Sequence, residues 1–223
     1  MIERIQDHQI TISRVINILA LLALLMVLSG SLYLQFGVGE QPCPLCLVQR
    51  SAMIGLAVGP MLNLVSGIKA RNYAIAILAA CAGSAGSIRQ ILLHIATPGD
   101  PGYGPAVMGY HLYTWALITF IVAIVGCAVL LLWSGPLAAG DEGVHHGPSP
   151  MRALTWSAIV WVTIDLILIT IWVIPECGLG MCPDDPDPIS GLGVGGGVAL
   201  ILGQIVVSLL IGFGLDRKLL PKE

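Results

Sequence analysis

Six long apolar segments limit what this chain can fold into. A helix that crosses the hydrocarbon core of a bilayer needs about 20 mostly apolar residues, and each segment reaches that length. They run over Val15–Phe36, Leu47–Ile68, Tyr73–Ala96, Leu112–Trp133, Thr155–Ile174 and Val194–Leu215. Hydrophobic residues make up 56% of the chain and charged residues only 10%, which excludes an ordinary soluble domain. The sequence therefore predicts an all-α integral membrane protein with six spans.

The first segment is expected to remain in the protein. Glu3, Arg4, Asp7 and Arg14 precede it, and no small-residue cleavage site comes before the next polar stretch. These features favour a retained helix over a removed signal peptide. With six spans, both termini should lie on the same side of the membrane.

Basic residues indicate which side that is, because Lys and Arg in short loops stay on the cytoplasmic side. They fall in the two tails and in the even-numbered connections: Arg4, Arg14, Lys69, Arg71, Arg152, Arg217, Lys218 and Lys222. The odd-numbered connections carry mainly acids. For a bacterial inner-membrane protein, this predicts cytoplasmic termini and odd-numbered connections that face the periplasm, where disulfides persist.

The connection over 135–153 reads as a flexible cytoplasmic linker. It separates a four-helix core over 1–134 from a two-helix extension over 154–223. His145 and His146 lie in this linker without acidic or thiol companions, so we expect solvated side chains and no metal site. The net charge of −3 and the lack of a basic cluster exclude nucleic acid as a partner, which leaves membrane lipid around the spans.

Cys43 and Cys46 form a C-x-x-C motif where the first apolar segment has ended and the second begins. Such a pair favours an exchangeable disulfide with one low-pKa thiol. A helix that starts near Cys46 would place this sulfur at its positive end, with Arg50 one turn further on. An arginine at the hydrocarbon boundary indicates a functional site. The alternatives are a structural disulfide beside a snorkelling arginine, or half of a zinc site completed by Cys177 and Cys182.

Gln90 and His94 share one face at the end of the third apolar segment, on the same side of the membrane as the C-x-x-C motif. Their side chains could bind a carbonyl-bearing ligand or a neighbouring helix. The aromatic residues that follow, at positions 110 to 115, are expected to be interfacial anchors.

Cys177 and Cys182 lie in an exposed loop after the fifth apolar segment and can close a small disulfide ring. This ring is either accessible to a partner or a permanent staple. Asp165, in the middle of that segment, should carry a proton or hydrogen-bond to Thr163, Thr170 or a neighbouring helix. Cys81 and Cys127 are expected to be small core residues.

The C-x-x-C motif, Arg50 and the histidine-containing end of the third segment resemble the DsbB family of quinone-linked thiol oxidases, over roughly residues 12 to 134. The resemblance implies that Cys46 faces ubiquinone or menaquinone, that Arg50 polarises a quinone oxygen, and that Cys43 exchanges with a second cysteine pair. That pair would oxidise a thioredoxin-fold partner similar to DsbA. The family has four helices and places its second pair between the third and fourth.

In this chain the second pair would be Cys177 and Cys182, after an added fifth helix. The sequence thus favours a quinone-dependent thiol–disulfide oxidoreductase with Cys43, Cys46, Cys177 and Cys182 as catalytic residues. Arg50, Gln90 and His94 would bind the quinone. The alternative is a non-catalytic membrane subunit or assembly factor with structural or metal-binding cysteines. A transporter is less favoured, because paired discontinuous helices are not evident.

Overall fold

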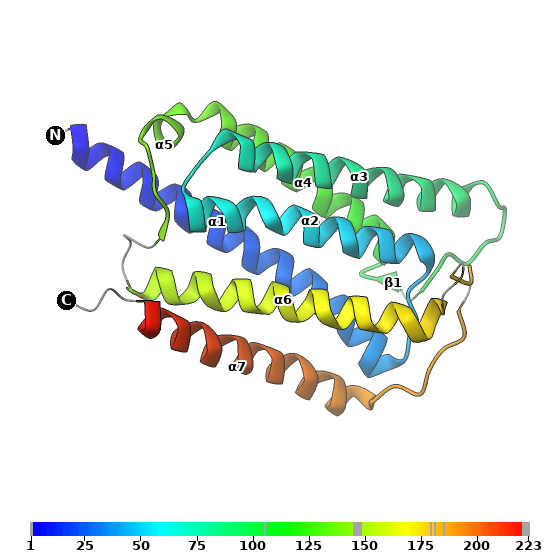
Figure 1. Cartoon of the computed structure of the whole chain (residues 1–223). Coiled ribbons are helices and arrows are strands. Elements are labelled where there is room, and N and C mark those ends of the chain that lie inside the picture. The colour runs from blue at the N-terminus through cyan, green and yellow to red at the C-terminus, as the bar shows by residue number, and fades with distance from the viewer. Residues whose placement is uncertain are drawn as a thin grey trace.

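The computed structural model describes residues 2–104, 106–144, 149–178, 180, 182–184 and 186–219. Within these residues, six long helices form an elongated bundle (Figure 1). They are α1 Ile2–Tyr33, α2 Pro44–Ser66, α3 Ala70–Ile95, α4 Leu112–Leu132, α6 Ser149–Cys177 and α7 Gly193–Leu219. Each contains a stretch long and apolar enough to span a membrane. The predicted all-α membrane fold is confirmed.

Shorter elements connect these helices. A π-helical segment, η1 Leu34–Val38, continues α1 toward the C-x-x-C motif. The strands β1 Ala106–Val107 and β2 Tyr110–His111 form an antiparallel hairpin between α3 and α4. The helix α5 Ser134–Ala138 follows α4 directly.

Several helices extend beyond the apolar segments that predicted them. α1 begins at Ile2 instead of Val15, and α6 runs over Ser149–Cys177 instead of Thr155–Ile174. Hydropathy marks only the part of a helix inside the hydrocarbon, whereas backbone hydrogen bonding continues into the polar boundary. Spans were therefore predictable, but helix ends were not.

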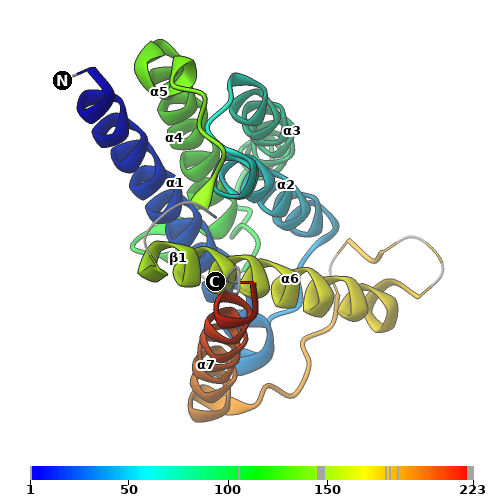
Figure 2. The same cartoon turned by 60° about the vertical axis from the view of Figure 1, so that its left-hand side comes forward.

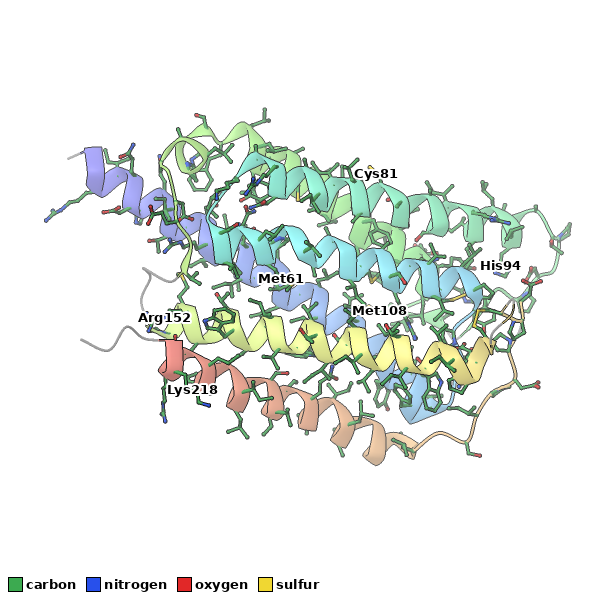
Figure 3. All side chains as sticks on the ribbon, viewed as in Figure 1. Met61, Cys81, His94, Met108, Arg152 and Lys218 are labelled. Carbon is green, nitrogen blue, oxygen red and sulfur yellow. A yellow bond between two sulfur atoms is a disulfide. The ribbon has the colours of Figure 1, made fainter. Side chains whose placement is uncertain are left out.

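The two ends of the bundle differ in what they carry. α1 begins and α7 ends at the same end, where Arg152 and Lys218 also lie, whereas His94 lies at the opposite end (Figures 1 and 3). The connections that contain the two cysteine pairs join α1 to α2 and α6 to α7, so both lie at the His94 end. This common placement brings all the predicted site residues to one end of the molecule.

A leucine stripe on α1 forms the centre of the core. Leu21, Leu25, Leu28 and Leu32 are fully buried and follow the three- and four-residue spacing of one helix face. α1 contacts both α2 and α6, so this stripe connects the four-helix core to the two-helix extension (Figure 2). Small residues bring other helices close: a Cβ at Gly59 of α2 would meet Ala76 Cβ of α3 at 2.7 Å.

Part of the predicted flexible linker is packed. Arg14 of α1 forms a buried ion pair with Asp141 and donates a hydrogen bond to Gly143 O at 2.5 Å. Burial alone would raise the pKa of Asp141, but hydrogen bonds from Arg14 and from the Gly143 and Ile68 amides outweigh it and lower that pKa. A buried arginine needs such a partner. The linker expected over 135–153 is therefore packed, and not free, at Asp141, Gly143 and Val144.

The rest of that linker includes His145 and His146, which lie outside the described residues. The proposed division into a core over 1–134, a linker over 135–153 and an extension over 154–223 stays a prediction.

Candidate functional site

The Cys43–Cys46 disulfide lies at the N-terminus of α2. Pro44 occupies the first turn, where its missing amide hydrogen is tolerated. Cys43 is the N-cap residue, and its Sγ accepts a hydrogen bond from the Cys46 amide at 3.1 Å. Since a helix N-terminus carries partial positive charge, this position favours a thiolate on the pair when it is reduced.

Gln90 of α3 contacts both sulfurs of this disulfide. Its Nε2 lies 3.1 Å from Cys43 Sγ and 3.7 Å from Cys46 Sγ, and its side chain is almost completely buried. Gln49 Nε2 donates to Gln90 Oε1 at 2.8 Å, which fixes the orientation of the Gln90 amide. The donor group of Gln90 is therefore held toward sulfur.

Arg50 lies one turn after Cys46 and is 8% exposed. Its Nη1 donates to Gln35 Oε1 at 2.5 Å, and its Nη2 donates to Ser31 O at 3.1 Å. Among the described residues, no carboxylate lies within ion-pair distance of Arg50. The guanidinium is thus held in place by neutral acceptors, and its charge stays available to a ligand.

A cavity of about 370 Å³ opens beside these groups. Its lining is mostly apolar and includes Cys46, Arg50, Gln90, Tyr103, Tyr113 and Trp115. Tyr103 Oη donates to Gln41 O at 2.7 Å, and Trp115 Nε1 donates to Val107 O at 2.9 Å, so the hairpin and its preceding loop form one wall. Cavities of this size with few polar groups suit a small, largely apolar ligand.

His94 lies behind this cavity and does not line it. Its Nδ1 lies 2.9 Å from Asp100 Oδ2, and its ring stacks on Tyr113 with centroids 5.2 Å apart. The Gly102 amide and then His94 lower the pKa of Asp100. Any contribution of His94 to a ligand would act through Tyr113, so its predicted direct contact with a quinone stays a prediction.

The Cys177–Cys182 disulfide lies at the opposite kind of helix end. Cys177 is the last residue of α6, and the two Cα atoms are 4.2 Å apart. The neighbouring Glu176 has both carboxyl oxygens buried, with no hydrogen-bond partner among the described residues. The helix C-terminus disfavours a thiolate here.

A groove of about 280 Å³ next to this loop is lined by Gln41, Trp172 and Glu176, among others. Gln41 also lines the cavity beside Arg50, so one side chain separates the two spaces. Its Oε1 accepts from Trp172 Nε1 at 3.2 Å. The connection between α1 and α2, which carries Cys43 and Cys46, is therefore in direct contact with the end of α6.

Backbone hydrogen bonds attach the late loop to the segment before Cys43. Ile189 N donates to Gly39 O at 3.0 Å, and Leu192 N donates to Phe36 O at 2.7 Å. Gly39 adopts a left-handed conformation with φ of 92°. A Cβ at Gly39 would lie 2.1 Å from Ile189 O, so only glycine fits at this crossing.

Sequence reasoning missed the partners that orient the predicted residues. Gln35 and Gln49 hold Arg50 and Gln90, and Gln41 joins the two cysteine connections. Uncharged polar residues inside or next to apolar segments were the available signal. The expectation of a core position was wrong for Cys81, which is exposed on the bundle surface (Figure 3).

Comparison with known proteins agrees with this arrangement. The family described as "Disulfide bond formation protein DsbB" matches residues 13–101, which include Cys43, Cys46, Arg50, Gln90 and His94. No solved structure gives a significant match.

Curated relatives named "Disulfide bond formation protein B" cover more of the chain. The protein of Burkholderia pseudomallei (strain 1106a) is 30% identical over 154 residues, which is 52% of this chain and 89% of the relative. The protein of Verminephrobacter eiseniae is 31% identical over 162 residues, which is 70% of this chain and 84% of the relative. The protein of Pseudomonas syringae pv. tomato is 28% identical over 133 residues, which is 45% of this chain and 79% of the relative.

Proposed function

Because the chain belongs to the disulfide bond formation protein DsbB family, we propose that it is a thiol:quinone oxidoreductase of the bacterial inner membrane. It would reoxidise a periplasmic thioredoxin-fold dithiol protein similar to DsbA and pass the electrons to ubiquinone or menaquinone. One observation carries this proposal: the Cys43–Cys46 disulfide lies at a helix N-terminus, beside a cavity that also contains Arg50.

The cavity residues fit a quinone. A quinone ring is flat and apolar and carries two carbonyl oxygens that accept hydrogen bonds, and this cavity offers aromatic walls and a buried guanidinium. Arg50 has five N–H donors, of which two have protein acceptors, so donors remain for a ligand oxygen. Arg50, Tyr103 and Tyr113 would hold the ring. A bound quinone would supply the electron acceptor, taking two electrons and two protons from the reduced Cys43/Cys46 pair.

Thiol–disulfide exchange would bring the electrons to this pair. A thiolate of the partner attacks the Cys177–Cys182 bond and forms a mixed disulfide. The partner's second thiol then attacks the mixed disulfide, so that the partner leaves with its own disulfide formed, and Cys177 and Cys182 are both reduced. In the next exchange, a thiolate of the late pair attacks Cys43 and displaces Cys46 as a thiolate. The other late cysteine then re-forms Cys177–Cys182 and leaves Cys43 and Cys46 reduced.

The helix ends support this direction of flow. A disulfide whose reduced form is stabilised is the stronger oxidant. The α2 N-terminus and Gln90 stabilise a thiolate at Cys43 or Cys46, whereas the α6 C-terminus destabilises one at Cys177. Electrons should therefore pass from the late pair to the early pair.

Replacing Cys46 by Ser tests the proposal. The purified protein in lipid would be mixed with a reduced thioredoxin-fold dithiol protein and ubiquinone, and quinone reduction followed by absorbance. Cys46→Ser should abolish turnover, whereas Cys81→Ser, on the exposed face of α3, should retain it. Turnover by Cys46→Ser would remove this mechanism. Absence of turnover in the unsubstituted protein with both ubiquinone and menaquinone, together with disulfides that resist mild reduction, would favour the non-catalytic alternative.

A further inference from the structure

The seam between α6 and α7 carries polar groups in the middle of the membrane-spanning segments. Asp165 of α6 is fully buried, and Gln204 and Ser208 of α7 are 6% and 1% exposed. These residues lie after the region that matches the DsbB family, residues 13–101, and the proposed electron path does not use them. A buried carboxyl group in a span is expensive and indicates a site.

The register of the two antiparallel helices places these groups together. At one level, Gln204 Nε2 donates a hydrogen bond to Asp165 Oδ1. Two turns away, a Cβ at Gly212 would lie 2.2 Å from Ser157 Oγ. This register pairs Trp161 with Ser208 at the level between them. Arg152 Nε donates to Asp216 Oδ1 at 2.5 Å at the end of the seam.

Two acceptor atoms at this seam have no donor within the described chain, which indicates that a proton is needed there. Asp165 Oδ2 and Gln204 Oε1 are both buried and have no hydrogen-bond partner in the part of the chain that the structure describes. Both are acceptors if the carboxyl group is ionised, so they could not bond to each other. A proton on Oδ2 would turn it into a donor. A carboxylic acid and a primary amide can then form two parallel hydrogen bonds, and the Asp165–Gln204 contact is already one of them.

Charged groups on the surrounding elements do not compensate an ionised Asp165. Among the described residues, no cation forms an ion pair with it. On α1 and α2, Arg14 is bound by Asp141, and Arg50 by Gln35 and Ser31. On α6 itself, Glu176 lies about 16 Å further along the helix.

A short polar connection leads from Asp165 toward the end where the termini lie. Trp161 Nε1 lies one turn from Asp165, and Ser208 Oγ one turn from Gln204. Both atoms are buried and lack a hydrogen-bond partner within the described ranges. Buried polar groups of this kind are commonly satisfied by water. The Arg152–Asp216 pair lies at the end of the same seam, so Trp161 and Ser208 lie between Asp165 and the polar boundary.

We propose that the α6–α7 seam is a proton-binding site. Asp165 holds the proton as a neutral acid paired with the Gln204 amide, and it exchanges that proton by way of the Ser208 hydroxyl with the side of the membrane where Arg152 lies. The Trp161 indole N–H, which can only donate a hydrogen bond, lies beside this path. This proposal does not depend on quinone or on thiol exchange.

Infrared difference spectroscopy tests the site without any enzymatic assay. The spectrum of the lipid-reconstituted protein at pH 7 minus that of Asp165→Asn should contain the C=O stretch of a neutral carboxylic acid. Asp7→Asn, which replaces an exposed carboxyl group of α1, is the control and should retain this band. Gln204→Leu removes the amide partner and should shift the band. After transfer into D₂O the band should move by isotope exchange, more slowly in Ser208→Ala.

Two results would overturn the proposal. If Asp165→Asn removes only carboxylate bands, the group is ionised and the site does not hold a proton. If the neutral-acid band in potassium buffer turns into carboxylate bands when sodium replaces potassium at constant pH, the seam is a sodium site instead.

Carbodiimide labelling provides an independent check, since the reagent adds to neutral carboxyl groups in membranes. It should mark the peptide with Asp165 in the unsubstituted protein but not in Asp165→Asn.

Discussion

The two disulfides lie at the same end of the bundle but at opposite kinds of helix terminus. In the Cys43–Cys46 pair, Cys43 caps the N-terminus of α2 and is buried, and both sulfurs receive hydrogen bonds from Gln90. Cys177–Cys182 follows the C-terminus of α6 beside Glu176. The difference gives a physical reason for an order of electron flow, because the surroundings stabilise the reduced form of the first pair and destabilise that of the second.

The largest expected effect comes from separating the two pairs. In Gly39→Ala, a Cβ would overlap Ile189 O and push the late loop away from the Cys43 connection. Overpacking of about 3 kcal/mol should slow electron transfer from Cys177/Cys182 to Cys43–Cys46 about a hundredfold. Rapid mixing followed by thiol trapping and mass spectrometry would measure this step.

Gly99→Ala is the matched control for that variant. Gly99 also has a positive φ, of 81°, but a Cβ there would meet no described atom within 4 Å. It therefore carries the same backbone strain without the clash and should transfer electrons at nearly the normal rate. Equal slowing in both variants would mean that contact between the loops is not required.

The next effect concerns the charge beside the first pair. Arg50→Met keeps an unbranched apolar stem but removes the guanidinium donors from the cavity, and hydrogen bonds to a charged group contribute about 1.5–3 kcal/mol. The KM for quinone should rise on the order of tenfold to a hundredfold. Steady-state kinetics with a short-chain quinone would measure it.

Arg89→Met is the control for the loss of positive charge, because Arg89 lies on the exposed face of α3. Its KM should stay within about twofold of normal, as for most surface substitutions. A similar rise in KM for both variants would assign the effect to long-range electrostatics and remove the direct role of Arg50.

The smallest effect should come from Gln90→Leu. Removal of the amide that contacts Cys43 Sγ costs a thiolate about 1 kcal/mol of hydrogen bonding. The reduction potential of the Cys43/Cys46 pair should fall by on the order of 20 mV, which narrows its difference from the late pair. Titration against glutathione buffers would measure this potential. Gln49→Leu, which only releases Gln90, should show a smaller decrease, and an unchanged potential in Gln90→Leu would show that the contact has no redox role.

The sequence was enough to predict the spans, the C-x-x-C motif at the start of a helix and the placement of both cysteine pairs at one end. These depend on hydropathy and on local order along the chain, which sequence records directly. The supporting contacts are long-range, and no local pattern specifies them. Gln35 with Arg50, Gln49 with Gln90 and Ile189 with Gly39 each join segments whose packing had to be known first.

Asp165 shows the same limit. Its position in a span predicted either a proton or a hydrogen-bonding partner, with Thr163, Thr170 or a neighbouring helix as candidates. Thr163 instead donates to Ile159 O of its own helix, and the partner is Gln204 on α7. Only the register between α6 and α7 reveals which of the polar residues on the neighbouring helix is in reach.

The order of the two reduction potentials tests the central claim most directly. The double variant Cys177→Ser/Cys182→Ser isolates the first pair, and Cys43→Ser/Cys46→Ser isolates the second. Each would be equilibrated in lipid with glutathione buffers, quenched with an alkylating reagent and quantified by mass spectrometry. We predict a less negative potential for Cys43/Cys46 than for Cys177/Cys182. Equal potentials, or the reverse order, would contradict the proposed flow of electrons from the late pair to the early one.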